Sequence, residues 1–359
     1  MLSTVGSPTS ADLADKIFRE VAGLHTIDFG QCGDVLKFIM EPTPEREYAE
    51  FHDLYFRVYS MVSDIVDSNW LWLPARPRWT YLKVDHILLV EKRSLIHEAP
   101  FNHLSSIFGL FLHGFRVHDD NPVLTTTSMN FQLPSTFAIP DMAIQMTTAT
   151  ENHWSHEVIV IGECAFAQDT DSVRRKIKHE IAGHPNVLMV ILVVIDEHQP
   201  YRSPERMSEA WQMLCQETSP RSVSSFHSLQ GSTIRSPDQP IVIAGHTWCH
   251  LASVRFHVWV RGNEPINIDV DNSELQACGT LFPNRDMGAA DTMIEKGMVM
   301  MRDCIATVCQ EAAPGSYITA IQDSVVAFRP NWNDLLVGLK LGVWDTAYHR
   351  YRSWYDSPP

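Results

Sequence analysis

The chain has 359 residues, of which 45% are hydrophobic and 20% are charged, a composition typical of a globular protein with a sizeable core. Its formal net charge of −15 argues against a protein whose whole surface binds nucleic acid, so any such contact requires a local basic patch. A membrane partner is not expected, because no apolar run approaches the roughly 18 residues of a spanning helix.

The N-terminus and the cysteines predict an intracellular protein, cytoplasmic or nuclear. The opening MLSTVGSPTSADLADKIF lacks the basic and apolar regions of a secretory signal. Seven cysteines, an odd number at scattered spacings, are typical of reduced thiols and not of a disulfide framework.

The first third of the chain predicts an extension followed by a helix and a strand. Residues 1–40 are mixed in composition and predict an N-terminal extension with one short helix near Ala11 to Val21. After the prolines at positions 42 and 44, apolar residues recur at helical spacing over residues 45–67, which predicts a helix. Residues 81–91 predict a strand, and residues 103–116 fit either a helix or a strand.

The central part of the chain predicts two adjacent strands that each carry one acidic residue, Asp141 on the first and Glu163 on the second. The predicted elements are strands near 137–146, 157–165 and 187–195 and a basic amphipathic helix at 169–183. Two converging carboxylates repel each other unless a cation or a shared proton neutralises them. The pair is therefore the best candidate for a functional site.

The remainder predicts an insertion and then a second strand-rich block. Residues 199–240 are rich in Ser, Pro, Gln and Arg and predict a variable surface insertion with a short helix at 205–216. The later predictions are strands within 240–245, 251–262 and 264–270, a hairpin turn at Gly262-Asn263, and helices at 286–310 and 332–355. The methionines of the first of these helices predict core filling.

Two short motifs resemble those of the PD-(D/E)XK nuclease superfamily, the restriction-endonuclease-like proteins. They are Pro140-Asp141 and Glu163-Cys164-Ala165-Phe166-Ala167-Gln168, whose order and spacing are closest to fungal PD-(D/E)XK-like proteins. Residues 42–47 resemble the start of the helix that precedes the site in those proteins. The similarity spans about residues 42–197, with a weaker part from 254 to 305.

The resemblance implies an α/β fold in one domain, residues 41–359, with a central mixed sheet flanked by helices. Its core would be residues 42–197, the insertion 199–240, and a C-terminal extension of strands and helices 241–359. The sheet would use the strands near 81–90, 137–146, 157–165 and 187–195, flanked by helices 45–67 and 169–183.

The resemblance also implies hydrolysis of nucleic acid with Mg²⁺ or Mn²⁺. A hard cation neutralises the phosphate and makes a water nucleophilic at neutral pH. Asp141 and Glu163 would hold the metal, the carbonyl of Cys164 would add a ligand, and Glu47 would complete the shell through water. The other prediction for Glu47, an acidic first turn of a helix, stays open beside this one.

The sequence departs from the family at Ala165, where the family has the lysine that orients the attacking water. The helix at 169–183 can return a cation to the site, from Lys176 or Lys178, with Gln168 as a polar partner at its start. The alternative is that the basic residues of this helix form a solvated face.

Two basic segments are candidates for contact with DNA or RNA. One is Arg174, Arg175, Lys176 and Lys178, and the other is Arg76 and Arg78 beside Trp79. Because Ala165 and the net charge disfavour catalysis, a second hypothesis is an inactive nuclease fold that binds or scaffolds protein partners. A third is a metal-dependent hydrolase of smaller substrates.

Overall fold

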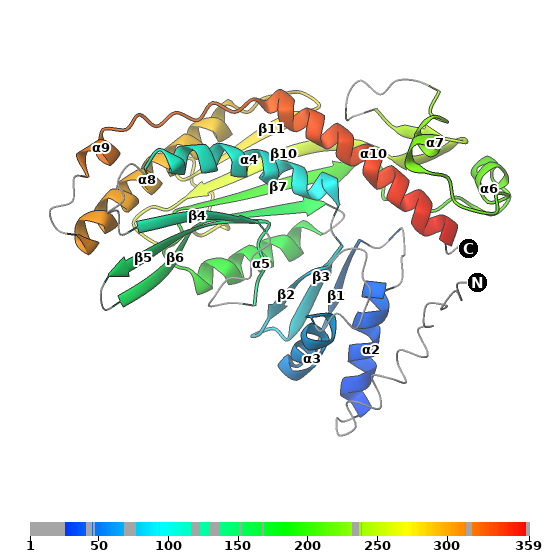
Figure 1. The fold of residues 1–359 in the computed structure, drawn as a ribbon, viewed down its shortest axis with the longest axis horizontal. Helices are drawn as coiled ribbons and strands as arrows, with labels where there is room; N and C mark the ends of the chain where they lie inside the picture. The colour runs from blue at the N-terminus through cyan, green and yellow to red at the C-terminus, as the bar shows by residue number, and fades with distance from the viewer. Residues whose placement is uncertain are drawn as a thin grey trace, which may run out of the picture.

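The fold is organised around a mixed six-stranded sheet (Figure 1). The computed structural model describes residues 26–40, 45, 47–67, 77–92, 94–115, 123–129, 137–150, 153–166, 169–231, 237, 239–313 and 318–356. The strand order is β11-β10-β7-β6-β5-β4, in which β6 and β7 are parallel and the other neighbours antiparallel. The strands are β4 (Val123–Met129), β5 (Met142–Thr150), β6 (His153–Phe166), β7 (Met189–Glu197), β10 (Leu251–Val260) and β11 (Gln276–Phe282). The predicted α/β class with a central mixed sheet is confirmed.

Helix α5 (Thr170–Gly183) connects the parallel strands β6 and β7 and covers one face of the sheet. Its apolar residues Val173, Ile177 and Ile181 are buried against that face. Strand β7 is buried on both faces, which explains why its sequence is a continuous apolar run and not an alternating one. The helix predicted at 169–183 and the strand predicted at 187–195 are confirmed.

Three helices cover the opposite face, α4 (Leu95–His113), α8 (Gly288–Ala312) and α10 (Trp332–Asp356) (Figure 1). Helix α4 begins after Ser94, whose hydroxyl accepts a hydrogen bond from the backbone N of His97 at 3.3 Å. Strand β6 lies so close to α4 at Gly162 that the Phe101 ring occupies the space of a Cβ. The helices predicted at 286–310 and 332–355 are confirmed, and the methionines of α8 lie in the core.

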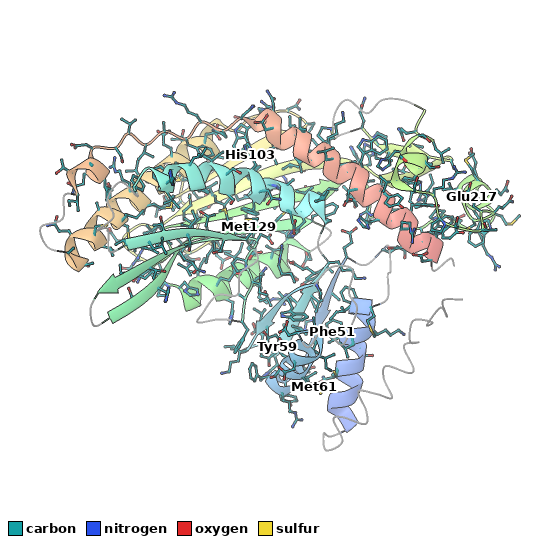
Figure 2. The ribbon with its side chains drawn as sticks, viewed as in Figure 1. Phe51, Tyr59, Met61, His103, Met129 and Glu217 are labelled. Carbon is teal, nitrogen blue, oxygen red and sulfur yellow. The ribbon has the colours of Figure 1, made fainter. Side chains whose placement is uncertain are left out.

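The N-terminal part forms a separate three-stranded sheet, in the order β1-β3-β2, packed against two helices. Its elements are α2 (Thr26–Met40), β1 (Tyr48–Phe51), α3 (Phe56–Asp67), β2 (Arg78–Leu82) and β3 (Ile87–Glu91). Phe51, Tyr59 and Met61 belong to the apolar cluster between this sheet and its helices (Figure 2). A bridge between Tyr81 and Phe137 joins the small sheet to the segment before β5.

Two sequence predictions for this region are wrong. The single helix predicted at 45–67 is a strand followed by α3, because β3 offers β1 backbone partners and Asp53 adopts a left-handed conformation (φ 53°) that separates the two. The strand predicted at 81–91 is a hairpin with an exposed turn at residues 83–86. It belongs to the small sheet and not to the central one.

The segment after β7 packs on the C-terminal helix. It contains α6 (Glu209–Leu214), α7 (Val223–His227), β8 (Ile241–Ile243) and β9 (His246–Cys249), and α9 (Thr319–Gln322) follows α8. Part of the predicted surface insertion is buried, since the Phe226 ring stacks on Tyr351 of α10 at 4.6 Å. The strand predicted at 264–270 is wrong, because Ile266 and Ile268 enter the core from the loop between β10 and β11. Because no strand follows at 264–270, the turn predicted at Gly262-Asn263 does not connect two strands of a hairpin.

Among the described residues, no helix combines the length and apolarity needed to cross a membrane. All seven cysteines are free thiols. The helix predicted at 11–21 lies outside the described residues.

Candidate functional site

Asp141 and Glu163 lie side by side in space, as predicted, but the strand predicted at 137–146 begins only at Met142, so Asp141 lies just before it. Asp141 directly precedes β5, Glu163 lies in β6, and the register pairs Met142 with Gly162. The backbone N of Cys164 donates a hydrogen bond to Asp141 Oδ2 at 2.5 Å, which ties the two motifs together. Each acidic side chain is only 1% exposed, so both need compensating partners inside the protein.

Lys176 of α5 is the partner of Glu163. Its Nζ lies 2.8 Å from Glu163 Oε2 and donates to the carbonyl of Ile139 at 3.0 Å. Burial lowers the pKa of Lys176, but the carboxylates of Glu163, Glu91 and Glu180 outweigh it, so that the pKa is raised and the ammonium stays charged. The structure therefore places a buried cation, the Lys176 ammonium, beside Glu163. Ala165, which fills the motif's lysine position, lies two residues after Glu163 in the sequence.

Glu180 lies one helical turn after Lys176 and is fully buried. Burial and the Glu163 carboxylate raise the pKa of Glu180 well above its usual value, and burial also raises the pKa of Glu163. Unless the two carboxyl groups share a proton, Glu163 Oε1 and both oxygens of Glu180 have no hydrogen-bond partner among the described residues. Neutrality here requires a proton or a further cation.

The raised pKa of Glu180 predicts a pH-dependent effect of Glu180→Gln. Because the folded pKa exceeds the unfolded one, the stability that the protonated group contributes is present at low pH and is lost as pH rises above about 4.5 toward the folded pKa. Glutamine stays neutral and can donate to Glu163. We expect urea unfolding in EDTA to give wild type and Glu180→Gln equal free energies of unfolding at pH 5. At pH 8 we expect Glu180→Gln to be more stable than wild type by roughly 1–3 kcal/mol.

The exposed Glu311→Gln change on α8 serves as the control and should shift stability little at either pH. A Glu180→Gln protein that loses stability relative to wild type as the pH rises would contradict the buried, protonated carboxyl.

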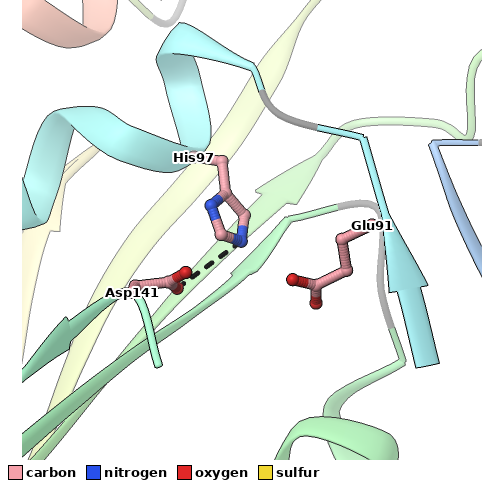
Figure 3. Close-up of side chains that lie close together, drawn as sticks. All are labelled: Glu91, His97 and Asp141. Carbon is pink, nitrogen blue, oxygen red and sulfur yellow. Dashed lines mark ion pairs between the residues drawn. The ribbon is translucent and has the colours of Figure 1, made fainter. Parts of the chain in front are cut away.

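A second group of side chains surrounds Asp141, drawn in Figure 3 without Arg78. His97 from the first turn of α4 places Nε2 3.6 Å from Asp141 Oδ2, and Glu91 comes from the end of β3. The guanidinium of Arg78 forms an ion pair with Asp141 Oδ1, and its Nη1 lies 3.4 Å from Glu91 Oε2 and 3.3 Å from His97 Nδ1. All four side chains are buried.

The two groups form one buried charge cluster, consisting of Arg78, Glu91, His97, Asp141, Glu163, Lys176 and Glu180. Two cationic side chains face four carboxyl groups, so with His97 neutral the cluster carries a net charge of −1 while Glu180 holds its proton and of −2 once every carboxyl is ionised. A divalent cation has the charge that would balance it. The oxygen-rich donor set fits such an ion, as do the oxygens of Glu163 and Glu180 for which the described residues offer no hydrogen-bond partner.

Several predicted site residues are not brought to this cluster. Lys178 turns to the surface and pairs with Asp269 at 2.7 Å, so Lys176 alone of the two lysines reaches Glu163. Glu47 lies at Arg350, 3.3 Å away, and not at Asp141. Gln168 lies outside the described residues, and Cys164 contributes its backbone N to Asp141.

The predicted basic patches also change. Arg78 and Lys176 are buried in the cluster and cannot present a basic surface, and Arg76 lies outside the described residues. Arg174 lies 3.6 Å from Asp269 and Arg175 lies 3.2 Å from Glu50. The surface of α5 therefore carries arginines that already face carboxylates.

A second ionic group lies at the end of β7, around Arg350 of α10. Its Nη1 and Nη2 contact both oxygens of Glu197 at 2.7 and 2.8 Å, and its Nε donates to Glu47 at 3.3 Å. Arg350 lines a cavity of about 310 Å³ together with three histidines, His198, His246 and His250. A further cavity of about 270 Å³ includes Gln145 and His184. Neither cavity is lined by Asp141, Glu163 or Lys176.

The sequence patterns do not single out Glu91, His97 or Glu180, and they predict Arg78 in a surface segment. Only Glu180 carried a local signal, since it lies four residues after Lys176 on the stripe of α5 that contains Val173 and Ile177. Arg78 and Glu91 meet through the pairing of β2 with β3, and His97 reaches them from the first turn of α4.

Comparison with known proteins gives no match: no family model, no curated protein and no solved structure matches the chain.

Proposed function

We propose that this chain is a metal-dependent phosphodiesterase of the PD-(D/E)XK kind that acts on nucleic acid. Asp141 and Glu163 would hold Mg²⁺ or Mn²⁺, and Lys176 would replace the lysine that is missing at Ala165. The observation that carries the proposal is the 2.8 Å contact between Lys176 Nζ and Glu163 Oε2 inside a cluster with excess negative charge. A lysine on the exposed face of α5, such as Lys178, would not support the proposal, because it pairs with Asp269 and not with Glu163.

The division of roles follows from the positions of the side chains. A bound divalent ion supplies charge neutralisation at the phosphate and lowers the pKa of a bound water. Cys164 N holds Asp141 Oδ2, which fixes the orientation of one ligand oxygen. Lys176, anchored by the Ile139 carbonyl, would stabilise negative charge that develops on the phosphate oxygens. The free thiols suit the cytoplasm or nucleus, where DNA and RNA substrates occur.

A second candidate function is an inactive nuclease fold that binds a partner. One observation favours it: Arg78 already pairs with Asp141, and every member of the buried charge cluster is at most 8% exposed. A phosphodiester must reach the carboxylates, so catalysis requires the cluster to open. A binding module has no such requirement.

Cleavage assays separate the two candidates. Plasmid, single-stranded DNA and RNA would be incubated in Mg²⁺, Mn²⁺ or EDTA with wild-type protein and with an Asp141→Ala/Glu163→Ala double variant. We expect cleavage by the wild type that requires metal and is lost in the double variant. Cleavage that persists in the double variant would rule out this site. No cleavage and no calorimetric metal binding by wild type would favour the binding module.

A further inference from the structure

The nitrogen Nη1 of Arg78 lies at the meeting point of three potential metal ligands. It is 3.4 Å from Glu91 Oε2 and 3.3 Å from His97 Nδ1, and the same nitrogen forms the ion pair with Asp141 Oδ1. Glu91, His97 and Asp141 can each offer one ligand atom such that these atoms all lie within 4.8 Å of one another. A cationic nitrogen therefore occupies the position that a metal ion would take.

We propose that Glu91, His97 and Asp141 form a binding site for a divalent transition-metal ion, and that the Arg78 guanidinium fills this site when no metal is bound. The site shares Asp141 with the proposed nuclease centre but uses two ligands that lie outside the Pro-Asp and Glu motifs. The inference deepens the proposed function and rests on it for its biological use, whereas metal binding itself can be measured independently.

The contact between Arg78 and His97 indicates which nitrogen of the imidazole can accept. A guanidinium only donates, so Nδ1 of His97 must be its unprotonated, accepting nitrogen in the contact with Arg78. Nε2 then carries the proton and faces Asp141 Oδ2 at 3.6 Å. A neutral imidazole with Nδ1 free to accept is the form that binds metals. The tautomer held by Arg78 is thus already the metal-binding one.

The donor set selects the class of ion. Two carboxylates and one imidazole include a nitrogen that Mg²⁺ disfavours and that Mn²⁺ and Zn²⁺ accept. Three protein ligands leave further coordination positions for water or a phosphate oxygen, as in catalytic and not structural sites. The metal would draw the three atoms to about 2.0–2.2 Å from its centre, which leaves no room for Arg78.

Arg78 can leave without unfolding the sheet. Its backbone pairs with Glu91 in the hairpin of β2 and β3, and only its side chain reaches the three ligands, so displacement of the guanidinium would leave the strand pairing in place. The metal ion and the Arg78 guanidinium then compete for the same site. The measured metal affinity is the intrinsic affinity multiplied by the fraction of molecules in which Arg78 has left the site. Regulation follows directly, because a negatively charged substrate that attracts Arg78 would favour loading of the metal.

The test is Mn²⁺ binding, followed by the loss of the free-ion electron paramagnetic resonance signal, in the full chain. Removing the competing cation by Arg78→Met is expected to tighten Mn²⁺ binding about 10- to 100-fold at one ion per chain, because the competent fraction rises from a few per cent toward one. Zn²⁺ should displace the Mn²⁺ more readily than Mg²⁺ does. Adding His97→Gln to Arg78→Met should return the affinity to the wild-type value or below it.

Lys178→Met is the matched control, since it removes a cation that pairs with the exposed Asp269. Equal Mn²⁺ affinity in Arg78→Met, Lys178→Met and wild type would overturn the proposal, as would binding that His97→Gln leaves unchanged. If Arg78→Met does not fold, Arg78→Gln is measured in its place. If both unfold in EDTA, refolding on addition of Mn²⁺ supports the site and failure to refold overturns it.

The outcomes separate this inference from the proposed function. Tight Mn²⁺ binding by Arg78→Met without cleavage of any nucleic acid would leave the metal site standing and remove the nuclease. Metal-dependent cleavage by the wild type, with no effect of Arg78→Met or His97→Gln on Mn²⁺ affinity, would do the reverse.

Discussion

Replacing Lys176 by methionine is expected to lower the free energy of unfolding by about 3–5 kcal/mol, because it leaves the buried Glu163 carboxylate without its cation. Methionine nearly preserves the volume of the stem, so the loss reports charge and hydrogen bonds. The bonds lost are those from Nζ to Glu163 and to the Ile139 carbonyl. In the protein that remains folded, cleavage should fall by about 100- to 1,000-fold, the effect of removing one stabilising donor from an active site.

Lys178→Met, two residues along the same helix, is the control for this change. Lys178 is half exposed and pairs with the exposed Asp269, and we expect less than about 1 kcal/mol of destabilisation and little change in cleavage. Urea unfolding and single-turnover cleavage below the melting transition give the two quantities separately. Equal stability of the two variants would contradict the buried Lys176–Glu163 pair.

Replacing Arg350 by methionine is the second large change. Arg350 is 4% exposed and joins α10 to Glu197 at the end of β7, to Glu47 before β1 and to the Trp248 carbonyl at 3.1 Å. Its loss leaves two partly buried carboxylates facing each other, and we expect a cost of about 3–5 kcal/mol. Burial raises the pKa of Glu47 and Arg350 opposes this, so the variant should bind a proton more readily near neutral pH.

The neighbouring Arg352→Met variant tests whether burial decides the effect. Arg352 pairs with Asp356 at 3.3 Å on the surface of the same helix, and its removal should cost less than about 0.5 kcal/mol. Denaturation curves of the two variants are compared directly. If Arg350→Met lowers the free energy of unfolding by less than about 1 kcal/mol, as expected for Arg352→Met, then Arg350 does not stabilise the packing of α10 on β7.

Local patterns predicted the helix and the strand that directly follow the acidic pair, α5 and β7. Residues 169–183 show a stripe of apolar residues at helical spacing, and residues 187–195 form an unbroken apolar run. The structure has a helix and a buried strand at these positions, because the apolar side chains pack in the core. The helical phase also distinguishes the lysines. Lys176 falls with Val173 and Ile177 on the buried stripe, whereas Lys178 points away from it.

The remaining part of the site depends on pairing that the sequence does not encode locally. Arg78 and Glu91 meet because β2 and β3 form a hairpin, whereas the single strand predicted at residues 81–91 does not include Arg78. His97 joins them through the capped start of α4. In the same region, pairing of β1 with β3 overrides the helical spacing predicted from residue 45. Tertiary contacts, and not local patterns, decided each case.

The most direct test of the proposed nuclease site is single-turnover cleavage by Glu163→Gln beside wild type, in Mn²⁺ and at equal folded fraction. Glutamine keeps an oxygen that can accept from Lys176 but removes the charge that would hold the metal. We predict that the wild type cleaves and that the variant loses at least about 100-fold in rate, as expected for loss of a metal ligand. A folded Glu163→Gln protein that cleaves at the wild-type rate would contradict the assignment of Glu163 to the metal.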